Sequence, residues 1–572
     1  MALPYVTDSR RLTGASLVLP VPGAILEVTA PTELKTKLRV HWRHFVKKLL
    51  ARVGWGDSLV ISRDQGPSQI LAISAPIDGL LSATHITEWA WEAALTKLKL
   101  AQAESLSEAT DDMLGRIARE ARPGLAALYR AANLRRIPVL LSENELSLGE
   151  GANARVYPFD DLPEPGEIAW RPKRHQVPTV LVTGTNGKTT TVRLLARMLA
   201  GGGQTVGFCS TDFVQIGAEV LQRDDYSGPT GARMVLRHPS TEIAVLEVAR
   251  GGMLRRGLQV IDADVGVVTN VANDHLGENG IHTLMQLAEA KFTIVRGLAS
   301  GAPVVVNADD EHCRTYARKL SHPICWFGFE RPSSSITRGR APRAGLVYLA
   351  QNQICVELAG DIKYVLNDVR DCPLSFRGGA RYNIANILAA TAAAVMLGTP
   401  VASITDALAQ FGSHPLDNPG RANLYQIDGA QVLLDYGHNP DGIAAILDAA
   451  AALPHKRLLI GVGLPGDRSD DAAREVGARV AAAKATLVIV KELSDYLRGR
   501  PEGELSGILR ASLKSHGFPE KRTQYLRTDA ELVSRALAWL KPGDLAVLFL
   551  HENVAQLSKL LLARAVLQRE EA

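Results

Sequence analysis

The chain has 572 residues, enough for three or four domains at ~150 residues each. Apolar residues make up 46% and charged residues 22%, as in globular proteins, and the net charge of +4 is too small to favour nucleic acid or a membrane surface as a partner. The residues after Met1 form no signal peptide, and no apolar stretch reaches the ~18 residues of a membrane helix. The five cysteines form no C-x-x-C pair. We therefore expect a cytoplasmic protein with buried free thiols.

Residues 1–165 are predicted to form an α+β domain. Strands are expected at 17–20, 24–28, 58–62 and 69–74, and helices at 33–53, at 84–98 and from about 107 to a break near Pro123. His41 and His44 raise the question of a metal site, but no carboxylate or thiolate lies near them, so a basic helix face is the better interpretation. Trp89 and Trp91 are expected in the core.

A phosphate-binding loop follows an apolar, β-branched run at 177–182. Its sequence is T-G-T-N-G-K-T-T, with the residues Gly184, Thr185, Asn186, Gly187, Lys188, Thr189 and Thr190, and an amphipathic helix comes next. The two glycines let the backbone close around a phosphate, the helix start favours negative charge, Lys188 supplies a cation and Thr189 a hydroxyl for Mg²⁺. The general P-loop has a glycine where this chain has Val182, so this is a shorter form. An ordinary glycine turn would leave the lysine and the hydroxyls unexplained.

Two α/β domains are predicted after an acidic, proline-rich boundary at 160–166. Residues 166–416 alternate strands (178–183, 205–209, 242–247, 264–269, 303–307) with helices (283–295, 382–398), which predicts a mostly parallel sheet with the loop at the carboxyl end of its first strand. Residues 417–572 form a second, Rossmann-like unit with strands at 431–435, 457–462, 486–491 and 545–550. No G-x-G-x-x-G turn follows its first strand, so we do not expect NAD.

Charged side chains follow the strands after the loop. Glu247 ends one strand, Asp274 and His275 follow the next, and Lys291 lies on the helix after it. Carboxylates at such positions are suited to hold the Mg²⁺ that ATP phosphates require. Taken alone, Glu247 is as well explained by a solvated or paired carboxylate, and His275 is better explained by a structural histidine.

Together these motifs resemble the Mur ligase superfamily of ATP-dependent, amide-forming enzymes. The resemblance covers about residues 165–560 and rests on the loop, on E-V-A-R-G-G at 247–252, on T-N-V-A-N-D-H-L-G at 269–277, on Lys291 and on R-Y-N-I-A-N-I-L-A-A at 381–390. Within the superfamily the chain is more similar to the cyanophycin synthetases, through S-G-P-T-G-A-R-M-V-L at 227–236, P-G-R-A-N-L at 419–424, L-D-Y-G-H-N-P at 434–440, G-L-P-G-D-R at 463–468 and Y-L-R-G-R at 496–500.

The resemblance implies a role for each matching residue. The loop would bind ATP, Thr189, Glu247 and His275 would hold Mg²⁺, and Lys291 falls where many Mur ligases carry a carbamylated lysine that helps to hold the metal. The residues that would approach or close onto ATP are Asn383, Asn386, Arg421, Asp435 and His438. The catalytic set would be Lys188, Glu247, His275 and Lys291.

The chain departs from the full-length cyanophycin synthetases before residue 166, where they have a complete ATP-grasp domain. The segment at 146–155 resembles the opening of that domain, cut short. The same abbreviation is found in the short second type of cyanophycin synthetase, which joins β-aspartyl-arginine dipeptides, so the resemblance implies a dipeptide substrate, a growing polymer and a homo-oligomer. Two alternatives stay open: an amide ligase with another carboxylate and amine, and an inactive nucleotide-binding scaffold.

Overall fold

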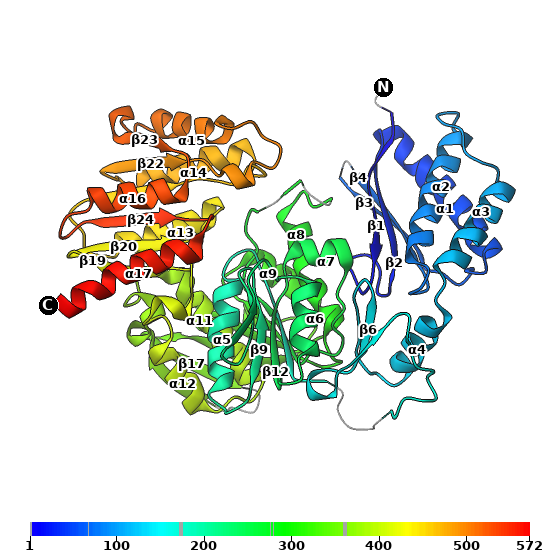
Figure 1. Ribbon diagram of the computed structural model, residues 1–572, viewed down its shortest axis with the longest axis horizontal. Coiled ribbons are helices and arrows are strands. Elements are labelled where there is room, and N and C mark those ends of the chain that lie inside the picture. Colours follow the sequence, from blue (N-terminus) through cyan, green and yellow to red (C-terminus); the bar gives the residue numbers. More distant parts are fainter. Residues whose placement is uncertain are drawn as a thin grey trace.

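The computed structural model describes residues 3–66, 68–170, 176–274, 276–277, 280–358 and 363–571. Three domains, each built on its own sheet, follow one another along the chain (Figure 1). In that view the N-terminal domain (blue) lies at the right, the central domain (green) in the middle and the C-terminal domain (orange and red) at the upper left. His275, predicted as a catalytic residue and metal ligand, lies outside the described residues.

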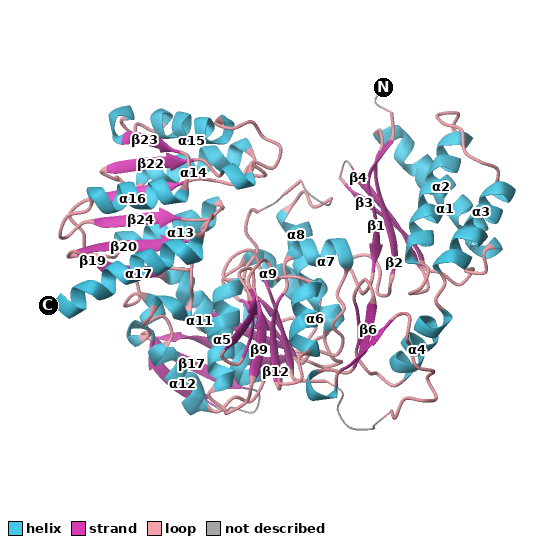
Figure 2. Ribbon diagram, viewed as in Figure 1, coloured by secondary structure: helices cyan, strands magenta, loops and turns pink. Residues whose placement is uncertain are grey.

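Helices pack against an antiparallel sheet in the N-terminal domain (Figure 2). The strand order is β1-β2-β4-β3, with the bounds β1 Tyr5–Leu12, β2 Gly23–Thr29, β3 Val60–Gln65 and β4 Ser68–Ser74. The helices are α1 (Thr32–Arg52), α2 (Leu80–Lys97) and α3 (Leu106–Glu120). Trp89 and Trp91 are buried between them and the sheet, as the sequence predicts.

The strand predicted at 17–20 is wrong, because these residues form bends. Pro20 and Pro22 have no N–H to donate to a neighbouring strand. The stretch is instead folded back on Ser16, whose hydroxyl accepts a hydrogen bond from the N–H of Leu19 at 3.0 Å. The strand that pairs with β2 is β1, and its polar sequence carries no alternation of apolar and polar residues that would have predicted it.

The break predicted near Pro123 is confirmed. Helix α3 ends at Glu120, and Pro123 opens α4 (Pro123–Leu134), where its missing N–H costs no hydrogen bond. A small antiparallel sheet follows, with β5 at Val139–Leu141, β6 at Glu145–Leu148 and β7 at Arg155–Pro158. That this segment is the remnant of an ATP-grasp domain stays a prediction.

The central domain carries the long sheet, with the order β11-β10-β9-β12-β8-β13-β14-β15-β16-β17-β18. The strands from β9 to β16 in that order run parallel, and antiparallel strands extend both edges. The bounds are β8 Thr179–Thr183, β9 Val206–Cys209, β10 Val214–Ile216, β11 Glu219–Gln222, β12 Ile243–Glu247, β13 Val265–Val268, β14 Val304–Asn307, β15 Ile324–Gly328, β16 Arg343–Ala350, β17 Gln353–Leu358 and β18 Lys363–Asp368.

Helices connect the parallel strands of this sheet, and two more follow its last strand, β18. They are α5 (Lys188–Ala200), α6 (Pro229–Arg237), α7 (Arg250–Arg256), α8 (Leu284–Lys291), α9 (Glu311–Ala317), α10 (Ser334–Thr337), α11 (Arg381–Met396) and α12 (Val401–Gln410). The helix expected at 283–295 is shorter than predicted, because α8 ends at Lys291 and continues as a 3-10 helix to Gly297. The five cysteines are free, and all but Cys355 are buried.

The C-terminal domain has the Rossmann-like arrangement that the sequence predicts. Its sheet order is β19-β20-β24-β21-β22-β23, and all neighbours except β19 and β20 run parallel. The strands are β19 (Asn423–Ile427), β20 (Ala430–Asp435), β21 (Leu458–Val462), β22 (Leu487–Lys491), β23 (Thr523–Leu526) and β24 (Leu545–Phe549). The helices are α13 (Pro440–Ala451), α14 (Asp470–Ala482), α15 (Glu504–Ser515), α16 (Asp529–Trp539) and α17 (Val554–Glu571).

Three strand ends lie level at the centre of the long sheet. Strand β8 lies between β12 and β13, with Val182 opposite Glu247 and Thr183 opposite Val268. Ligands bind at such points in open α/β sheets, because the loops that leave neighbouring strands diverge there. No helix in the described part of the chain is both long and apolar enough to cross a bilayer.

Candidate active site

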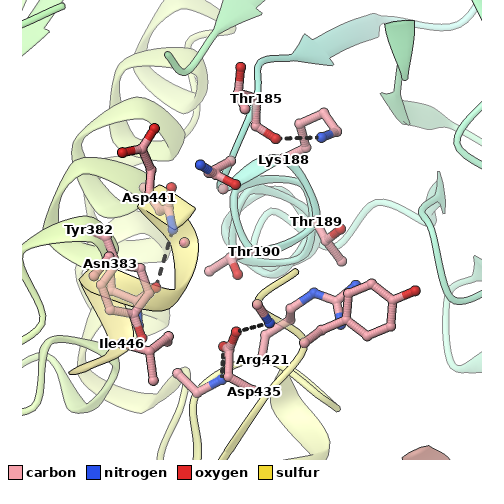
Figure 3. Close-up of a pocket in the computed structure, with 18 of the residues that line it drawn as sticks. Thr185, Lys188, Thr189, Thr190, Tyr382, Asn383, Arg421, Asp435, Asp441 and Ile446 are labelled. Carbon is pink, nitrogen blue, oxygen red and sulfur yellow. Dashed lines mark hydrogen bonds between the residues drawn. The ribbon is translucent and has the colours of Figure 1, made fainter. Parts of the chain in front are cut away.

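A cleft of about 310 Å³ lies where the central and C-terminal domains meet. One wall is the loop between β8 and α5, a second is the start of α11, and the third is the loop between β20 and α13 (Figure 3). The predicted residues that line it are Thr185, Asn186, Gly187, Lys188, Thr189, Thr190, Glu247, Asn383, Asn386, Arg421, Asp435 and His438. Segments up to about 250 residues apart in sequence therefore meet at one place.

The phosphate loop is held in shape by close backbone contacts. Gly184 has φ +150° and Gly187 has φ +85°, and a Cβ on Gly187 would lie 2.0 Å from the Oδ1 of Asn386. The side chain of Asn270 brackets the loop, since its Oδ1 accepts the N–H of Asn186 at 2.9 Å and its Nδ2 donates to the Asn186 carbonyl at 3.0 Å. The backbone is thus fixed before any ligand enters, which is the arrangement that a phosphate cradle requires.

Lys188 is the first residue of α5, so its charge stands at the positive end of the helix. Its Nζ donates to the carbonyl of Thr185 at 3.0 Å, which folds the side chain back over the loop (Figure 3). This bond leaves two of the three ammonium hydrogens for phosphate oxygens.

Glu247 lies at the end of β12 and is 1% exposed. The hydroxyls of Thr189 and Thr211 each donate to its carboxylate at 2.9 Å. A carboxylate beside a loop hydroxyl is a suitable donor set for Mg²⁺, which prefers one or two carboxylates together with phosphate and water oxygens. Among the described residues no group of three or more His, Cys, Asp and Glu side chains is arranged to hold a metal.

Lys291 ends α8 and is 4% exposed. Burial and the nearby charge of Lys188 lower the pKa of Lys291 to about 7. A substantial fraction of this amine is therefore neutral near physiological pH, which is the form that reacts with carbon dioxide. Lys291 does not belong to the lining of the cleft, and its carbamylation stays a prediction.

The C-terminal domain closes the cleft with Arg421, Asp435 and His438. The Asp435 carboxylate accepts the N–H groups of Ala422 at 2.8 Å and Gly437 at 2.7 Å, and burial raises the pKa of Asp435 to about 6, against the lowering effect of Arg421. Burial lowers the pKa of His438 to about 4, so that imidazole is neutral at pH 7. Asp435 would offer a hydrogen-bond acceptor to a ribose hydroxyl.

Three buried polar side chains of the C-terminal domain are linked to the loop between β20 and α13 that lines the cleft. Lys491, 0% exposed, forms an ion pair with Asp529, and its Nζ lies 3.3 Å from the Nδ1 of His551. An ammonium has only hydrogens to offer, so Nδ1 accepts and the Nε2–H of His551 donates to the carbonyl of Gly437 at 3.2 Å. The contact fixes the turn between Asp435 and His438.

The far end of the cleft is apolar, formed by Ala445 and Ile446 of α13 and by Tyr382 of α11. The hydroxyl of Tyr382 is buried and has no hydrogen-bond partner among the described residues. Asn383 and Asn386 lie one turn apart on α11, where the Nδ2 of Asn386 donates to the Oδ1 of Asn383 at 3.2 Å. A polar, cationic end and an apolar end with an unpaired hydroxyl suit the triphosphate and the base of a nucleotide.

Several residues at the site were not assigned a role from the sequence. Asn270, Tyr436, Asn439 and Arg468 lie within motifs that carried the resemblance, but nothing in the sequence shows what they contact. The Nδ2 of Asn439 donates to the Oδ1 of Asn186 at 2.9 Å, and Arg468 pairs with Asp274 at 2.9 Å. Both contacts join the central and C-terminal domains, and only the fold brings these residues together.

Family models match both of these domains. The model of the Mur ligase middle domain matches residues 182–394, and that of the Mur ligase glutamate ligase domain matches residues 420–549. The chain belongs to the Mur ligase family. Both matches coincide with the sheets that border the cleft, so the family resemblance seen in the motifs is confirmed.

This Mur ligase family member is similar to two groups of curated proteins, the cyanophycin synthetases and the ligases that are named for 2,6-diaminopimelate. The cyanophycin synthetase of Trichormus variabilis is 34% identical over 395 residues, which cover 69% of this chain and 43% of that protein. That of Synechocystis sp. is 35% identical over 389 residues, 68% of this chain and 44% of that protein. The UDP-N-acetylmuramoyl-L-alanyl-D-glutamate–2,6-diaminopimelate ligase of Bacillus cereus is 24% identical over 389 residues, 65% and 73% of the two chains. The chain thus spans less than half the length of the cyanophycin synthetases it matches.

The contact between Gly187 and Asn386 gives a steric test of the phosphate loop. In Gly187→Ala the new Cβ meets a buried side chain that is already hydrogen-bonded to Asn383, so the loop must shift, and a strain of ~1–3 kcal/mol corresponds to a loss of ADP affinity of about fivefold or more. Gly203→Ala is the control, because Gly203 has a similar φ of +81° and nothing within 4 Å. Equal ADP affinity for both variants in calorimetry would refute the loop geometry.

Proposed function

We propose that this protein is an ATP-dependent carboxylate–amine ligase that forms an amide through an acyl phosphate. The observation that carries the proposal is the joining of three features in one cleft: the phosphate loop, the buried Glu247 tied to Thr189, and Arg421 and Asp435 from a second domain. The Mur ligase family membership supports the same reaction, since the curated relatives are named as synthetases and ligases.

The chain's own residues would act on the phosphates and on the access of water. A substrate carboxylate oxygen attacks the γ-phosphorus, the bond to ADP breaks, and Lys188 stabilises the charge on the transferring phosphoryl group. Mg²⁺, held by Thr189 and Glu247, would supply further charge for the phosphate oxygens. An amine then attacks the acyl carbon, phosphate leaves and the amine loses a proton. The acyl phosphate reacts with water, so closure of the C-terminal domain over it is required.

For the substrate we propose β-aspartyl-arginine or a close dipeptide analogue, joined into a polymer. The similarity to cyanophycin synthetases supports this choice, as does the presence of one T-G-T-N-G-K-T-T loop in the sequence. A polymer of two amino acids contains two kinds of bond, and one activating site can extend it if each added unit already contains the other bond. The alternative within the same class is an amide ligase with another carboxylate and amine.

An inactive nucleotide-binding scaffold is the alternative of a different class. The preserved contacts of Lys188, Thr189 and Glu247 argue against it, because loss of activity would remove the constraint on such a buried, polar arrangement. Release of phosphate that depends on a carboxylate and an amine separates the two classes.

Removal of the loop cation tests the assignment of the nucleotide site. Lys188→Ala should lower the rate of ligation by ~10²-fold or more, because a charge at the transferring phosphoryl group is lost. Lys514→Ala removes a lysine that is 70% exposed on α15 and should leave the rate unchanged. Ligation by Lys188→Ala at the rate of the control would mean that the loop does not bind the reacting phosphates.

The metal ligand is tested by a change of charge at constant shape. In Glu247→Gln the side chain can still form hydrogen bonds with the two threonine hydroxyls, but its negative charge is lost. The Mg²⁺ concentration that gives half-maximal activity should therefore rise about tenfold or more. The same titration of ADP binding should shift in parallel. Curves that overlay those of the parent protein would exclude Glu247 as a ligand.

The substrate is tested by comparing β-aspartyl-arginine with an equimolar mixture of free aspartate and arginine. With ATP and Mg²⁺ we expect polymer from the dipeptide, with one phosphate released per unit, and none from the mixture. Mass spectrometry of the products measures both. Polymer from the free amino acids would contradict the dipeptide proposal, and product from a different amine and carboxylate pair would favour the other amide ligase.

A further inference from the structure

A tight turn between β9 and β10 lies beside the cleft and contacts both domains that form it. The turn runs from Ser210 to Phe213, and the N–H of Ser210 donates to the Phe213 carbonyl at 3.0 Å. Thr211 points to the candidate metal site, where its hydroxyl donates to Glu247. Asp212, the next residue, points to arginines instead. None of the sequence motifs includes this residue.

Two arginines from different domains meet at Asp212. Arg193 of α5 donates to its carboxylate at 2.6 Å, and Arg421, which follows the linker of residues 411–420 after α12, approaches it at 3.3 Å. Their side chains are 2% and 14% exposed. Two guanidinium groups so deeply buried would repel each other strongly without the carboxylate between them. Burial alone would raise the pKa of Asp212, but the charges of Arg421 and Arg193 hold this pKa below its ordinary value.

Arg193 extends the contact to the linker itself. Its Nη1 donates to the Oδ1 of Asn418 at 3.1 Å and to the carbonyl of Pro419 at 3.0 Å. The Nδ2 of Asn418 donates in turn to the hydroxyl of Thr190, in the first turn of α5. The linker is therefore bonded to the helix that begins with the phosphate loop.

Arg421 is held from its other side by an aromatic ring. Its guanidinium lies 4.4 Å from the centre of the Tyr436 ring, and both residues line the cleft. With Tyr436 on one side and Asp212 on the other, the rotation of the Arg421 side chain is restricted. Two neighbouring residues of one turn thus contact both groups, because Thr211 donates to Glu247 and Asp212 pairs with Arg421 of the closing domain.

We propose that Asp212 is a positioning residue that latches the C-terminal domain to α5 and so keeps water from the acyl phosphate. The inference rests on the ligase function proposed above. In the latched protein the amine attacks the acyl carbon, the bond from carbon to the phosphate oxygen breaks, and amide and phosphate form in equal amounts. If the latch opens, water attacks the same carbon, the same bond breaks, and the free carboxylate returns with phosphate, so ATP is consumed without amide.

The test measures phosphate released per amide formed, with β-aspartyl-arginine, ATP and Mg²⁺. Asp212→Asn keeps the shape and removes the charge, and the ratio should rise from close to one to about three or more. Arg193→Met should act in the same direction. Arg197→Met is the matched control, since Arg197 lies one turn further along α5 and contacts the exposed Gln410. A general loss of folding would lower both products together and leave the ratio unchanged.

A second measurement does not depend on turnover. Spin labels on Ala200→Cys of α5 and Lys514→Cys of α15, both exposed positions, report the separation of the two domains, with Cys355→Ser removing the half-buried native thiol. The parent should give one narrow distance distribution with and without ADP and Mg²⁺, and Asp212→Asn should add a second, shifted population. Asp224→Asn changes an exposed aspartate that follows β11 and is the control for the change of net charge.

The outcomes separate this inference from the proposed function. If the parent protein neither binds ADP nor forms amide, the ligase proposal fails, while the distance measurement still decides whether Asp212 latches the domains. If the parent forms amide and Asp212→Asn has the distances and the phosphate-to-amide ratio of the parent, the latch is wrong and the ligase proposal stands.

Discussion

The buried carboxylate of Glu247 sets the arrangement of the whole site. A carboxylate at the end of a central strand is tolerated only where other groups satisfy its oxygens, and here one threonine hydroxyl donates to each oxygen. Thr189 belongs to the helix that begins with the phosphate loop, and Thr211 belongs to the turn after β9. The position of that one carboxylate therefore couples the phosphate loop to the neighbouring hairpin, and through Asp212 to the closing domain.

The closed arrangement of the central and C-terminal domains follows from polar contacts that cross between them. Besides the arginines at Asp212, Asn439 contacts Asn186 in the phosphate loop and Arg468 pairs with Asp274. Such interfaces between domains of one chain usually permit movement, because their contacts are polar and can exchange with water. Because these contacts surround the cleft, a ligand bound there would add further contacts that hold the two domains in the closed arrangement.

Much of the fold could be predicted because its signals are local. The apolar strand before Gly184 and the helix after Gly187 are adjacent in sequence, and the buried parallel strands read as short apolar runs. The sequence does not predict strand β1, because this edge strand is polar and has no such pattern. It wrongly predicts a strand at 17–20, where Pro20 has no N–H to donate to a neighbouring strand. The residues that line the cleft could be predicted through family motifs. Asp212 could not, because no motif includes it and its partner Arg421 lies 209 residues away, so only the tertiary structure joins the two.

If a substrate carboxylate is activated as an acyl phosphate, one of its oxygens is transferred to the released phosphate, and this transfer can be measured. When the free carboxylate of the aspartyl unit in β-aspartyl-arginine is labelled with ¹⁸O, the bond that breaks in amide formation lies between the acyl carbon and a labelled oxygen. One labelled oxygen should therefore appear in the released phosphate for each amide formed. Amide formation with phosphate that carries no label would contradict activation as an acyl phosphate, because the carboxylate would then have been activated in another way.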